Sequence, residues 1–552
     1  MRRLAAALWL VVLAAGALAQ PAPAQPDVLF MARTALGADP GSASVALWRD
    51  GKLLQATVRR ESDKQAAVVV AEDGPAPLYE IGSISKVFTG LLLAQAVEKG
   101  DLSLDDTLGK LLHGKLEFVS PKVAAISLRQ LITHSSCLPR QFANPRDFRA
   151  VVNELRKTDR VDLMMALQKQ EITQAAPCPA LYSNFGLALV GELLSEHYGK
   201  LWDDLVRERI TGPLGMVDTM LHLGAQSARL VPAFAGRVAT GPWLLDAYAG
   251  AGGLRASAAD MVLFGRALLA GRNGPLGAAA ERVLASLGTY QGHDIGYAVF
   301  IHGPPSHRTY SHSGLTGGYR AYLLLDPASG NVVVALASNA QAPVGRVASD
   351  WWAQRYPVSD QAIPIAAQQL EPYAGVYQVN PELSFSVVAY AGSLYVRSTN
   401  GVFRAYIAVA PDTFTRPAGG ARIAFARDGA RVTGMALEQS GARLVALRSA
   451  QSAPVDGVLA PGKTKDYVGR FAVPNQASPI EFDVRDDDGQ LSIRSTRFPW
   501  APVLPVAGRT DRFRYDIPDA EVQFERAADG AVQGLVLHQR GELRALKRAD
   551  AP

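Results

Sequence analysis

An internal duplication in the last third of the chain constrains its fold more than any other feature. One copy opens with Tyr373-Ala374-Gly375-Val376-Tyr377 and the next with Tyr467-Val468-Gly469-Arg470-Phe471, 94 residues later. Their closing segments, 434–441 and 534–541, are 100 residues apart. Each copy consists of short β-type runs separated by Gly and Pro. Two copies are too few for a solenoid, so they predict two small antiparallel β-barrels, over 366–450 and 464–549, joined by an Ala- and Pro-rich linker.

The rest of the chain predicts one large mixed domain. At about 150 residues per domain, 552 residues correspond to three or four domains. Strand signals come first, helical periodicity dominates 101–285, and strands return between 295 and 340. The first and last strands must pair to bury their faces, which indicates a single α+β domain over 28–360. The elements expected are hairpins of 43–48 with 52–58 and of 319–325 with 332–338, and helices at 84–99, 185–197 and 258–269.

The N-terminus is typical of a secretory signal peptide. A basic head, Met1-Arg2-Arg3, precedes an apolar run over 4–16 and the small-x-small triplet Ala17-Leu18-Ala19. The apolar run of about 13 residues is too short to cross roughly 30 Å of hydrocarbon. The residue directly after Ala19 is Gln20 and not a Cys that could carry a lipid, and no later stretch reaches 18 apolar residues. We therefore expect a signal peptide over 1–19 and a soluble periplasmic or secreted protein without a membrane anchor.

Two cysteines, Cys137 and Cys178, are the whole complement of the chain. In an oxidising compartment they are candidates for a disulfide. A bridge would close a loop of about 40 residues and contribute roughly 4 kcal/mol in the chain-entropy account. Two unrelated thiols are the alternative, since a sequence does not show the Cα separation that a disulfide requires.

Composition and motif content exclude several functional classes. Charged residues make up 19% of the chain and the formal net charge is +5, with no clustered basic stripe, so no nucleic-acid partner is expected. The nine histidines show no metal-ligand spacing. H-E-x-x-H, G-x-S-x-G and G-x-G-x-x-G dinucleotide fingerprints do not occur in the sequence. We expect neither a metal nor a cofactor.

Three short motifs carry residue types suited to nucleophilic catalysis. The first, Tyr79-Glu80-Ile81-Gly82-Ser83-Ile84-Ser85-Lys86, places Ser-x-x-Lys at a predicted helix start, where Lys86 shares a helix face with Ser83. The second, Tyr182-Ser183-Asn184, precedes a predicted helix, and Asn184 also fits an ordinary N-cap. The third, His312-Ser313-Gly314, lies at a strand edge among glycines that would let substrate approach the backbone.

Together and in this order, the motifs resemble those of the penicillin-recognising serine hydrolases: class C β-lactamases, DD-carboxypeptidases, D-aminopeptidases and related esterases. The general triplet is S-x-x-K, S-D-N and K-T-G. The first motif is similar to the class C form at every position, the second resembles Y-x-N, and His312-Ser313-Gly314 departs from K-T-G as in the peptidase and esterase branches. The resemblance implies a β-lactamase/transpeptidase-like domain, with an antiparallel sheet flanked by helices and a helical subdomain. The paired barrels are similar in layout to those of D-aminopeptidases.

The resemblance also implies roles for single residues. Ser83 attacks a carbonyl and forms an acyl-enzyme that water hydrolyses. Lys86 and Tyr182 share the work of the general base, since neither is appreciably deprotonated at pH 7 unless its surroundings shift it. A further set positions the substrate or binds the oxyanion: Asn184, His312, Ser313, Gly314 and the backbone N–H groups of Ser83 and Leu315. The segment Gly250-Ala251-Gly252-Gly253-Leu254 resembles a stretch of the same group, although a glycine-rich turn explains it equally well.

His312 separates this sequence from relatives with Lys at that place. An imidazole with a reference pKa near 6.5 is mostly neutral at pH 7, whereas Lys stays cationic. We therefore expect weaker selection for substrates that bear a carboxylate. We also expect a pH profile with an inflection between about 5.5 and 7.5.

The substrate class stays open at this point. The class C-like first motif favours β-lactams, whereas His312 and the barrels favour D-amino-acid peptides, peptidoglycan or esters. Hydrolysis of a β-lactam or D-alanyl amide bond is the leading prediction. The alternatives are a carboxylic ester hydrolase and a penicillin-binding, peptidoglycan-sensing protein with little turnover.

Overall fold

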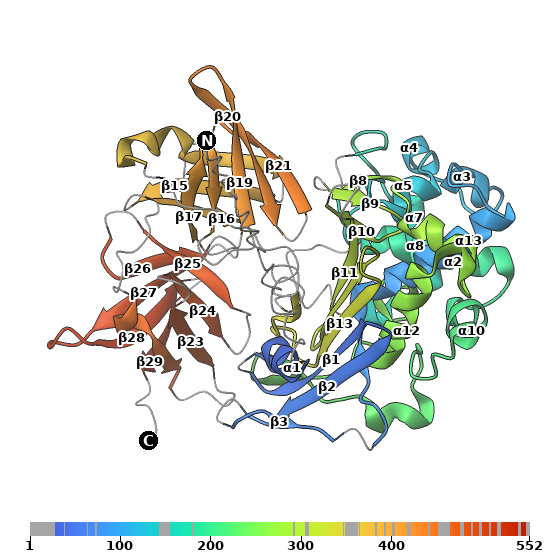
Figure 1. The fold of residues 1–552 in the computed structure, drawn as a ribbon, viewed down its shortest axis with the longest axis horizontal. Helices are drawn as coiled ribbons and strands as arrows, with labels where there is room; N and C mark the ends of the chain where they lie inside the picture. Colours follow the sequence, from blue (N-terminus) through green and yellow to red (C-terminus); the bar gives the residue numbers. More distant parts are fainter. Residues whose placement is uncertain are drawn as a thin grey trace, which may run out of the picture.

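The computed structural model describes residues 28–547, with internal gaps of which the longest are 143–154, 348–362 and 451–463. A nine-stranded sheet with its helices is followed by two closed barrels of eight strands each (Figure 1). The sheet order is β3-β2-β1-β13-β12-β11-β10-β9-β8. This architecture confirms the predicted α+β domain with two antiparallel barrels after it. The predicted signal peptide over 1–19 and most of the predicted linker lie outside the described residues.

The sheet and two small two-stranded sheets contain the strands of the first part of the chain. They are β1 (Gly41–Arg49), β2 (Lys52–Arg60), β3 (Val68–Val69), β4 (Tyr79–Glu80), β5 (Ala233–Ala235), β6 (Val238–Thr240), β7 (Arg255–Ala256), β8 (Gly288–Tyr290), β9 (His293–Ile295), β10 (Phe300–His302), β11 (Thr309–Leu315), β12 (Arg320–Asp326) and β13 (Asn331–Ala337). β4 pairs with β7, and β5 pairs with β6.

The α-helices of the same part of the chain are mostly short. They are α1 (Val28–Leu36), α2 (Ser85–Lys99), α3 (Leu108–Leu111), α4 (Pro121–Ala124), α5 (Leu128–Ile132), α7 (Arg160–Lys169), α8 (Asn184–Tyr198), α9 (Trp202–Val206), α10 (Gly212–Leu214), α11 (Ala249–Gly252), α12 (Ala258–Leu269) and α13 (Ala278–Leu284). Within the described part of the chain, no helix has the length and apolar character needed to span a bilayer.

The sheet joins strands from the two ends of the domain. β1 and β2 form the predicted hairpin around Asp50 and Gly51, whose φ angles of 50° and 76° suit a tight turn. β12 and β13 form the second predicted hairpin. β1 then pairs with β13, with Ala43 opposite Ala337. The expectation that the first and last strands pair is confirmed, and it closes the domain around one sheet.

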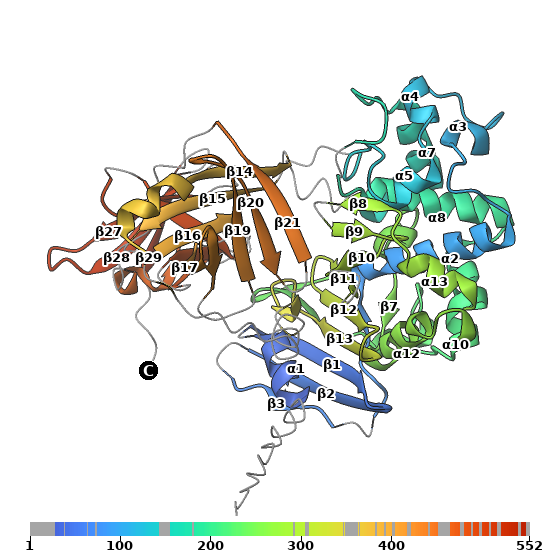
Figure 2. The ribbon, with the colours of Figure 1, turned by 45° about the horizontal axis from the view of Figure 1, so that its top comes forward.

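The two faces of the sheet have separate hydrophobic cores. Because side chains alternate along a strand, Ala43, Val45 and Leu47 of β1 pack with α1, whereas Ala46 joins the larger cluster that contains α12. Figure 2 shows α1 and α12 on opposite sides of the sheet. All the side chains of β13 are buried, as expected for a central strand covered on both faces.

The longest helices lie where the sequence predicts them, with one change at a terminus. α2 ends at Gly100, a left-handed C-cap with φ of 78°. At the start of α8, however, the N-cap is Ser183, whose hydroxyl accepts the N–H of Gly186 at 2.8 Å. Asn184 is therefore inside the helix, and the alternative reading of it as an ordinary N-cap is wrong. Its side-chain amide is free for another task.

The two barrels repeat one plan. The first contains β14 (Gly375–Asn380), β15 (Leu383–Tyr390), β16 (Ser393–Ser398), β17 (Arg404–Ala410), β18 (Thr413–Thr415), β19 (Ala421–Asp428), β20 (Arg431–Gln439) and β21 (Ala442–Arg448). The second contains β22 (Gly469–Ala472), β23 (Glu481–Asp486), β24 (Leu491–Ser495), β25 (Ala501–Pro505), β26 (Arg512–Tyr515), β27 (Glu521–Arg526), β28 (Val532–His538) and β29 (Glu542–Lys547). In both barrels each strand pairs with the next, and the last pairs with the first.

The duplicated sequence motifs form the same contacts in each barrel. In the first, the Tyr373 hydroxyl donates to Asp412 at 2.7 Å and its ring packs on Phe414. In the second, the Tyr467 hydroxyl donates to Asp511 at 2.6 Å. Asp412 and Asp511 both have positive φ, at 54° and 58°. A tyrosine anchored to a turn aspartate therefore explains why these positions recur.

A disulfide joins Cys137 to Cys178, as the first of the two alternatives predicts. The Cα atoms are 5.2 Å apart and the bond closes a separation of 41 residues. The two segments that it joins are also hydrogen-bonded to each other. The N–H of Cys178 donates to the carbonyl of Ser135 at 2.9 Å, and the N–H of Leu181 donates to the carbonyl of His134 at 3.0 Å. The disulfide thus ties the loop after α5 to the segment that leads into α8.

Loss of this disulfide should destabilise the large domain. For Cys137→Ala/Cys178→Ala we expect a fall of about 2–4 kcal/mol in the free energy of unfolding, because the unfolded chain regains loop entropy. Cys137 has φ of 66°, so Cys137→Gly/Cys178→Ala should recover about 1 kcal/mol of that loss. Urea titrations of the three proteins test both differences, and an equal midpoint for wild type and the alanine pair would contradict the expectation.

Candidate active site

The nucleophile candidate lies in the turn that begins α2. Residues Gly82–Ile84 form a 3-10 turn directly before Ser85–Lys99, and Ser83 is half-buried there. The Lys86 amine lies 3.1 Å from the Ser83 hydroxyl, on the same face of the helix start. The predicted proximity of Ser83 and Lys86 is therefore present in the structure.

Lys86 is buried and lies among three oxygen atoms. Besides Ser83, its Nζ contacts Asn184 Oδ1 at 2.8 Å and the carbonyl of Ala251 at 2.5 Å. Burial lowers the pKa of Lys86 well below its usual range, and the positive charge of Arg140 lowers it further. A neutral amine has two hydrogens for Asn184 and Ala251, which leaves its lone pair for the Ser83 hydroxyl.

The contact with Ala251 also explains the glycine-rich segment. Residues Ala249–Gly252 form one helical turn, α11, before the predicted helix 258–269, which is α12. The carbonyl of Ala251 accepts from Lys86, and that of Gly250 accepts from Thr89 at 2.7 Å. This turn thus packs directly on α2, so the segment belongs to the site and is more than a connecting turn.

Tyr182 approaches Ser83 from the other side, on the segment before α8. Its hydroxyl is hydrogen-bonded to Ser83, and Lys86 Nζ lies 4.9 Å from the centre of its ring. Burial raises the pKa of the Tyr182 phenol, while the Ser83 hydrogen bond and the charge of Arg140 oppose that rise. Tyr182 is accordingly a protonated phenol near neutral pH, and Lys86 is the group whose proton affinity is reduced.

The third motif lies on β11, the strand next to the nucleophile turn. His312 is buried, its Nδ1 is 2.7 Å from the carbonyl of Ser313, and its ring stacks on Phe300. Burial, and then the charge of Lys86, lower the pKa of His312 to about 3. The expected inflection between 5.5 and 7.5 is therefore wrong for this residue, because a buried imidazole loses the water that would stabilise its charged form. Ser313, in contrast, is exposed.

The glycines in and beside the third motif lie against other parts of the protein and not against open space for a substrate. A Cβ at Gly314 would overlap the carbonyl of Ile81, and one at Gly317 would lie 2.5 Å from the indole nitrogen of Trp243. Conversely, a Cβ at Gly82, where φ is 50°, would lie 2.8 Å from the backbone nitrogen of Leu315. The expected approach of substrate to these glycines is thus replaced by direct contact between β11 and the nucleophile turn.

A pocket with about 290 Å³ of empty space, part of it open to solvent, lies beside Ser83. Its walls combine backbone, apolar side chains and a few polar groups, from Gly82, Ser83, Leu155, Asn184, Trp243, Leu245, Tyr248, Ala251, Gly252, Leu315 and Thr316. Ser83, Asn184 and Leu315 are therefore brought to one cavity, as predicted. His312 lies behind it, close enough to Lys86 for the two charges to interact.

Sequence reasoning missed four side chains that hold the site together. His134 is buried, accepts the N–H of Ser183 on Nδ1 at 3.2 Å, and its ring lies 4.4 Å from that of Tyr182. The guanidinium of Arg140 lies 5.0 Å from the Tyr182 ring. No motif signal marks either residue, because both act through contacts with the distant segment around Tyr182 that form only in the folded chain.

The other two form a buried ion pair. Arg255 Nη2 is 3.2 Å from Glu80 Oε1, and the same oxygen accepts the N–H of Trp243 at 2.7 Å. Burial raises the pKa of Glu80, while the charge of Arg255 opposes that rise. Glu80 lies within the first motif and so could have been suspected. Its partner Arg255 is 175 residues away, and no sequence pattern links the two.

Comparisons with known proteins show what the chain is similar to. Penicillin-binding protein 4 of Amycolatopsis lactamdurans is 28% identical over 328 residues, which are 54% of this chain and 81% of that protein. The D-alanyl-D-alanine-carboxypeptidase/endopeptidase AmpH of Escherichia coli K12 is 30% identical over 142 residues, 26% of this chain and 36% of its own length. The octameric penicillin-binding protein homologue from Pyrococcus abyssi has the same fold, with a TM-score of 0.50 and 19% identity over 74% of this chain and 96% of that chain.

The family assignment rests on a match to a family model. A family model described as Beta-lactamase matches residues 34–358, more than half of the 552 residues. The matched region contains Ser83, Lys86, Tyr182 and the whole pocket described above. The chain therefore belongs to the Beta-lactamase family and is a serine hydrolase of the class C and DD-peptidase-like type.

Proposed function

We propose that the protein hydrolyses an amide bond, in a β-lactam or a D-alanyl or other D-amino-acid peptide, through an acyl-enzyme on Ser83. The observation that carries the proposal is the buried Lys86 amine in contact with Ser83, Asn184 and Ala251. An amine held neutral beside a hydroxyl can remove its proton as that oxygen attacks a carbonyl. Lys86 is then the principal base for acylation.

Tyr182 completes the proton transfer. Its phenol is hydrogen-bonded to Ser83 and keeps its proton near neutral pH, so it can donate to the leaving nitrogen when the amide bond breaks. The proton gained by Lys86 then restores the Tyr182 phenol, whose ring centre lies 4.9 Å from Nζ. In deacylation the same groups work in reverse on a water molecule, which attacks the ester and releases the acid.

Two backbone N–H groups, of Ser83 and Leu315, would stabilise the oxyanion. The absence of a Cβ at Gly82 lets its backbone contact that of Leu315, and both Ser83 and Leu315 line the pocket. Donors fixed by the fold need no reorganisation when charge develops on the carbonyl oxygen. Asn184, which holds Lys86 through Oδ1, keeps its NH₂ for the acyl side of the substrate.

The neutral state of His312 bears on the substrate. With its pKa near 3, this residue offers no positive charge at pH 7, so selection for a substrate carboxylate is weaker than with Lys at that place. Penicillin-binding protein 4 and the carboxypeptidase/endopeptidase AmpH support a β-lactam or D-alanyl substrate. A carboxylic ester hydrolase, which the uncharged His312 favours, is the second candidate.

We also propose that the protein is secreted. The basic and apolar pattern over 1–19 supports a cleaved signal peptide and a periplasmic or extracellular location. The disulfide between Cys137 and Cys178 supports an oxidising compartment.

Whole-protein mass spectrometry after exposure to penicillin tests the nucleophile. Wild type should gain the mass of one penicillin molecule, and Ser83→Ala should gain none and lose at least about 10³-fold in kcat. Ser85→Ala is the matched control, because the Ser85 hydroxyl accepts the N–H of Leu254 and lies outside the proposed chemistry. An adduct on Ser83→Ala would end the proposal. An adduct on wild type without continued turnover would identify a penicillin-binding sensor instead.

The pKa of His312 predicts how stability varies with pH. In the unfolded chain His312 binds a proton below about pH 6.5, whereas in the folded protein it does so only near pH 3. The free energy of unfolding therefore falls as the pH falls through this interval. The contribution is about 1.4 kcal/mol per pH unit. His312→Asn should therefore lose about 2 kcal/mol less than wild type between pH 7 and 5, as measured by urea titration. His113→Asn, at an exposed position, should match wild type.

A further inference from the structure

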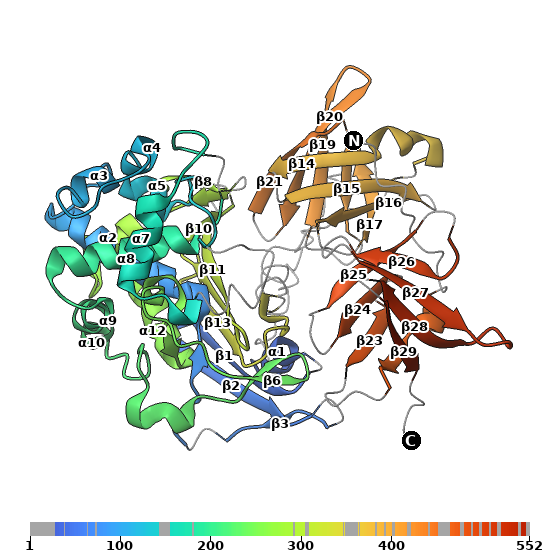
Figure 3. The same cartoon turned by 180° about the vertical axis from the view of Figure 1, so that it is seen from behind.

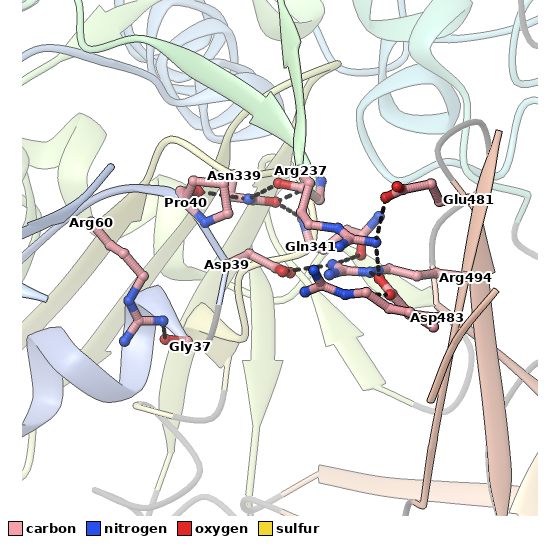
Figure 4. Close-up of polar contacts among 12 residues, drawn as sticks. Gly37, Asp39, Pro40, Arg60, Arg237, Asn339, Gln341, Glu481, Asp483 and Arg494 are labelled. Atoms are coloured by element: carbon pink, nitrogen blue, oxygen red, sulfur yellow. Dashed lines mark hydrogen bonds and ion pairs between the residues drawn. The ribbon is translucent and has the colours of Figure 1, made fainter. Parts of the chain in front are cut away.

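The second barrel meets the large domain through a buried cluster of charges (Figure 4). Arg494, on β24, is buried and donates to Asp39 Oδ1 at 2.6 Å and to Asp483 Oδ2 at 2.7 Å. Asp39 lies between α1 and β1 of the large domain, and Asp483 lies on β23 of the barrel. Arg494 therefore joins one acid from each side.

A second arginine crosses the boundary in the opposite direction. Arg237 is at the tip of the hairpin formed by β5 and β6, and its Nη2 lies 2.6 Å from Asp483 Oδ2 and 3.4 Å from Glu481 Oε2. Asp483 thus accepts from Arg237 and Arg494 through the same oxygen. Figure 3 shows β6 beside α1 and β1, on the side that faces β23 and β24. Because these groups are largely withdrawn from water, removing one of them weakens the charge compensation of its neighbours.

The hairpin tip is also held from within the large domain. The buried side chain of Asn339 donates to the carbonyl of Gly236 at 2.7 Å and accepts its N–H at 3.1 Å. The same Nδ2 donates to the carbonyl of Pro40 at 2.8 Å, next to Asp39. The barrel, the start of β1 and the hairpin therefore meet at one point.

The other end of this segment forms a wall of the active-site pocket. β6 ends at Thr240, and Trp243 and Leu245 line the pocket with Ser83. The Trp243 N–H is held by Glu80, and its indole lies against Gly317. β5 and β6 themselves pack on Gly318, where a Cβ would overlap Ala233 and Thr240. A short rigid path thus runs from the barrel to the pocket.

We propose that the second barrel acts as a clamp that positions the pocket wall, and that Arg237 is the positioning residue through which it acts. The clamp holds the hairpin 233–240, and with it Trp243, against the turn that follows β11. It touches neither Ser83 nor Lys86. Its loss should therefore weaken substrate binding and leave the chemical step unchanged, which distinguishes it from the catalytic groups.

The charge cluster indicates which variants are informative. Asp483 also lies 3.3 Å from Arg470, so Arg237→Gln leaves this acid with two other cations and should not unfold the barrel. Asp483→Asn, in contrast, would remove an acid that contacts Arg237, Arg470 and Arg494 at once. Arg237→Lys retains the positive charge and should still hold the hairpin 233–240 in place. Arg512→Gln is the matched control, since Arg512 pairs with Glu521 inside the same barrel at 2.5 Å.

Hydrogen exchange measured by mass spectrometry on the full-length protein tests the clamp without any substrate. In Arg237→Gln and Arg494→Gln the peptide over 233–248 should exchange about fivefold faster or more, because local opening becomes easier. In Arg237→Lys and Arg512→Gln it should match wild type. Unchanged exchange in both glutamine variants would overturn the proposal.

Kinetics with a chromogenic cephalosporin give the second readout, which rests on the proposed function. Arg237→Gln should raise KM about tenfold with kcat within about twofold of wild type, whereas Arg512→Gln should change neither. A fall in kcat at constant KM would overturn the positioning role. If wild type neither hydrolyses nor binds the cephalosporin, the β-lactam branch of the proposed function fails, and the exchange result still decides on the clamp.

Discussion

The buried amine of Lys86 is the interaction on which the rest of the site depends. It lies where the 3-10 turn before α2, the start of α8 and the turn α11 meet, and each of them contributes one oxygen: Ser83, Asn184 and Ala251. Removing an ammonium group from water is costly, so the same packing that buries Lys86 favours its neutral form. The position of the Lys86 amine and its lowered pKa therefore both follow from its burial. Any change that lets water reach Nζ would alter the pKa of Lys86 as well as the geometry of the nucleophile.

Close backbone packing brings the other groups to that amine. Gly82 and Gly314 allow β11 and the nucleophile turn to touch, which places Leu315 at the pocket that contains Ser83. On the opposite side, His134 and the disulfide hold the segment that carries Tyr182. The Glu80–Arg255 pair ties the first motif to the strand after α11 and to Trp243. The site is thus assembled from segments that are far apart in the chain and rigid where they meet.

Much of this could be predicted from sequence, and the failures have physical causes. The hairpins, α2, α12 and the duplicated barrels follow from local periodicity and turn residues, which act over a few positions. The N-cap of α8 was assigned to Asn184 because Asn is favoured there, but serine is equally suited, and the bond from Gly186 shows that Ser183 has that role. The pKa of His312 was misjudged because a reference value assumes water around the ring, and Phe300 and the interior of the domain replace that water.

By itself the sequence determined which chemistry the chain carries: a serine three residues before a lysine at a helix start, a Tyr-x-Asn motif, a His-Ser-Gly motif and a repeated tyrosine-anchored barrel. These are local patterns, and local forces are enough to produce them. Only the tertiary structure decided which protonation states the groups adopt, that Glu80 meets Arg255, and that Arg237 reaches across to Asp483. Those outcomes depend on burial and on contacts between distant segments, and neither quantity exists until the whole chain has packed.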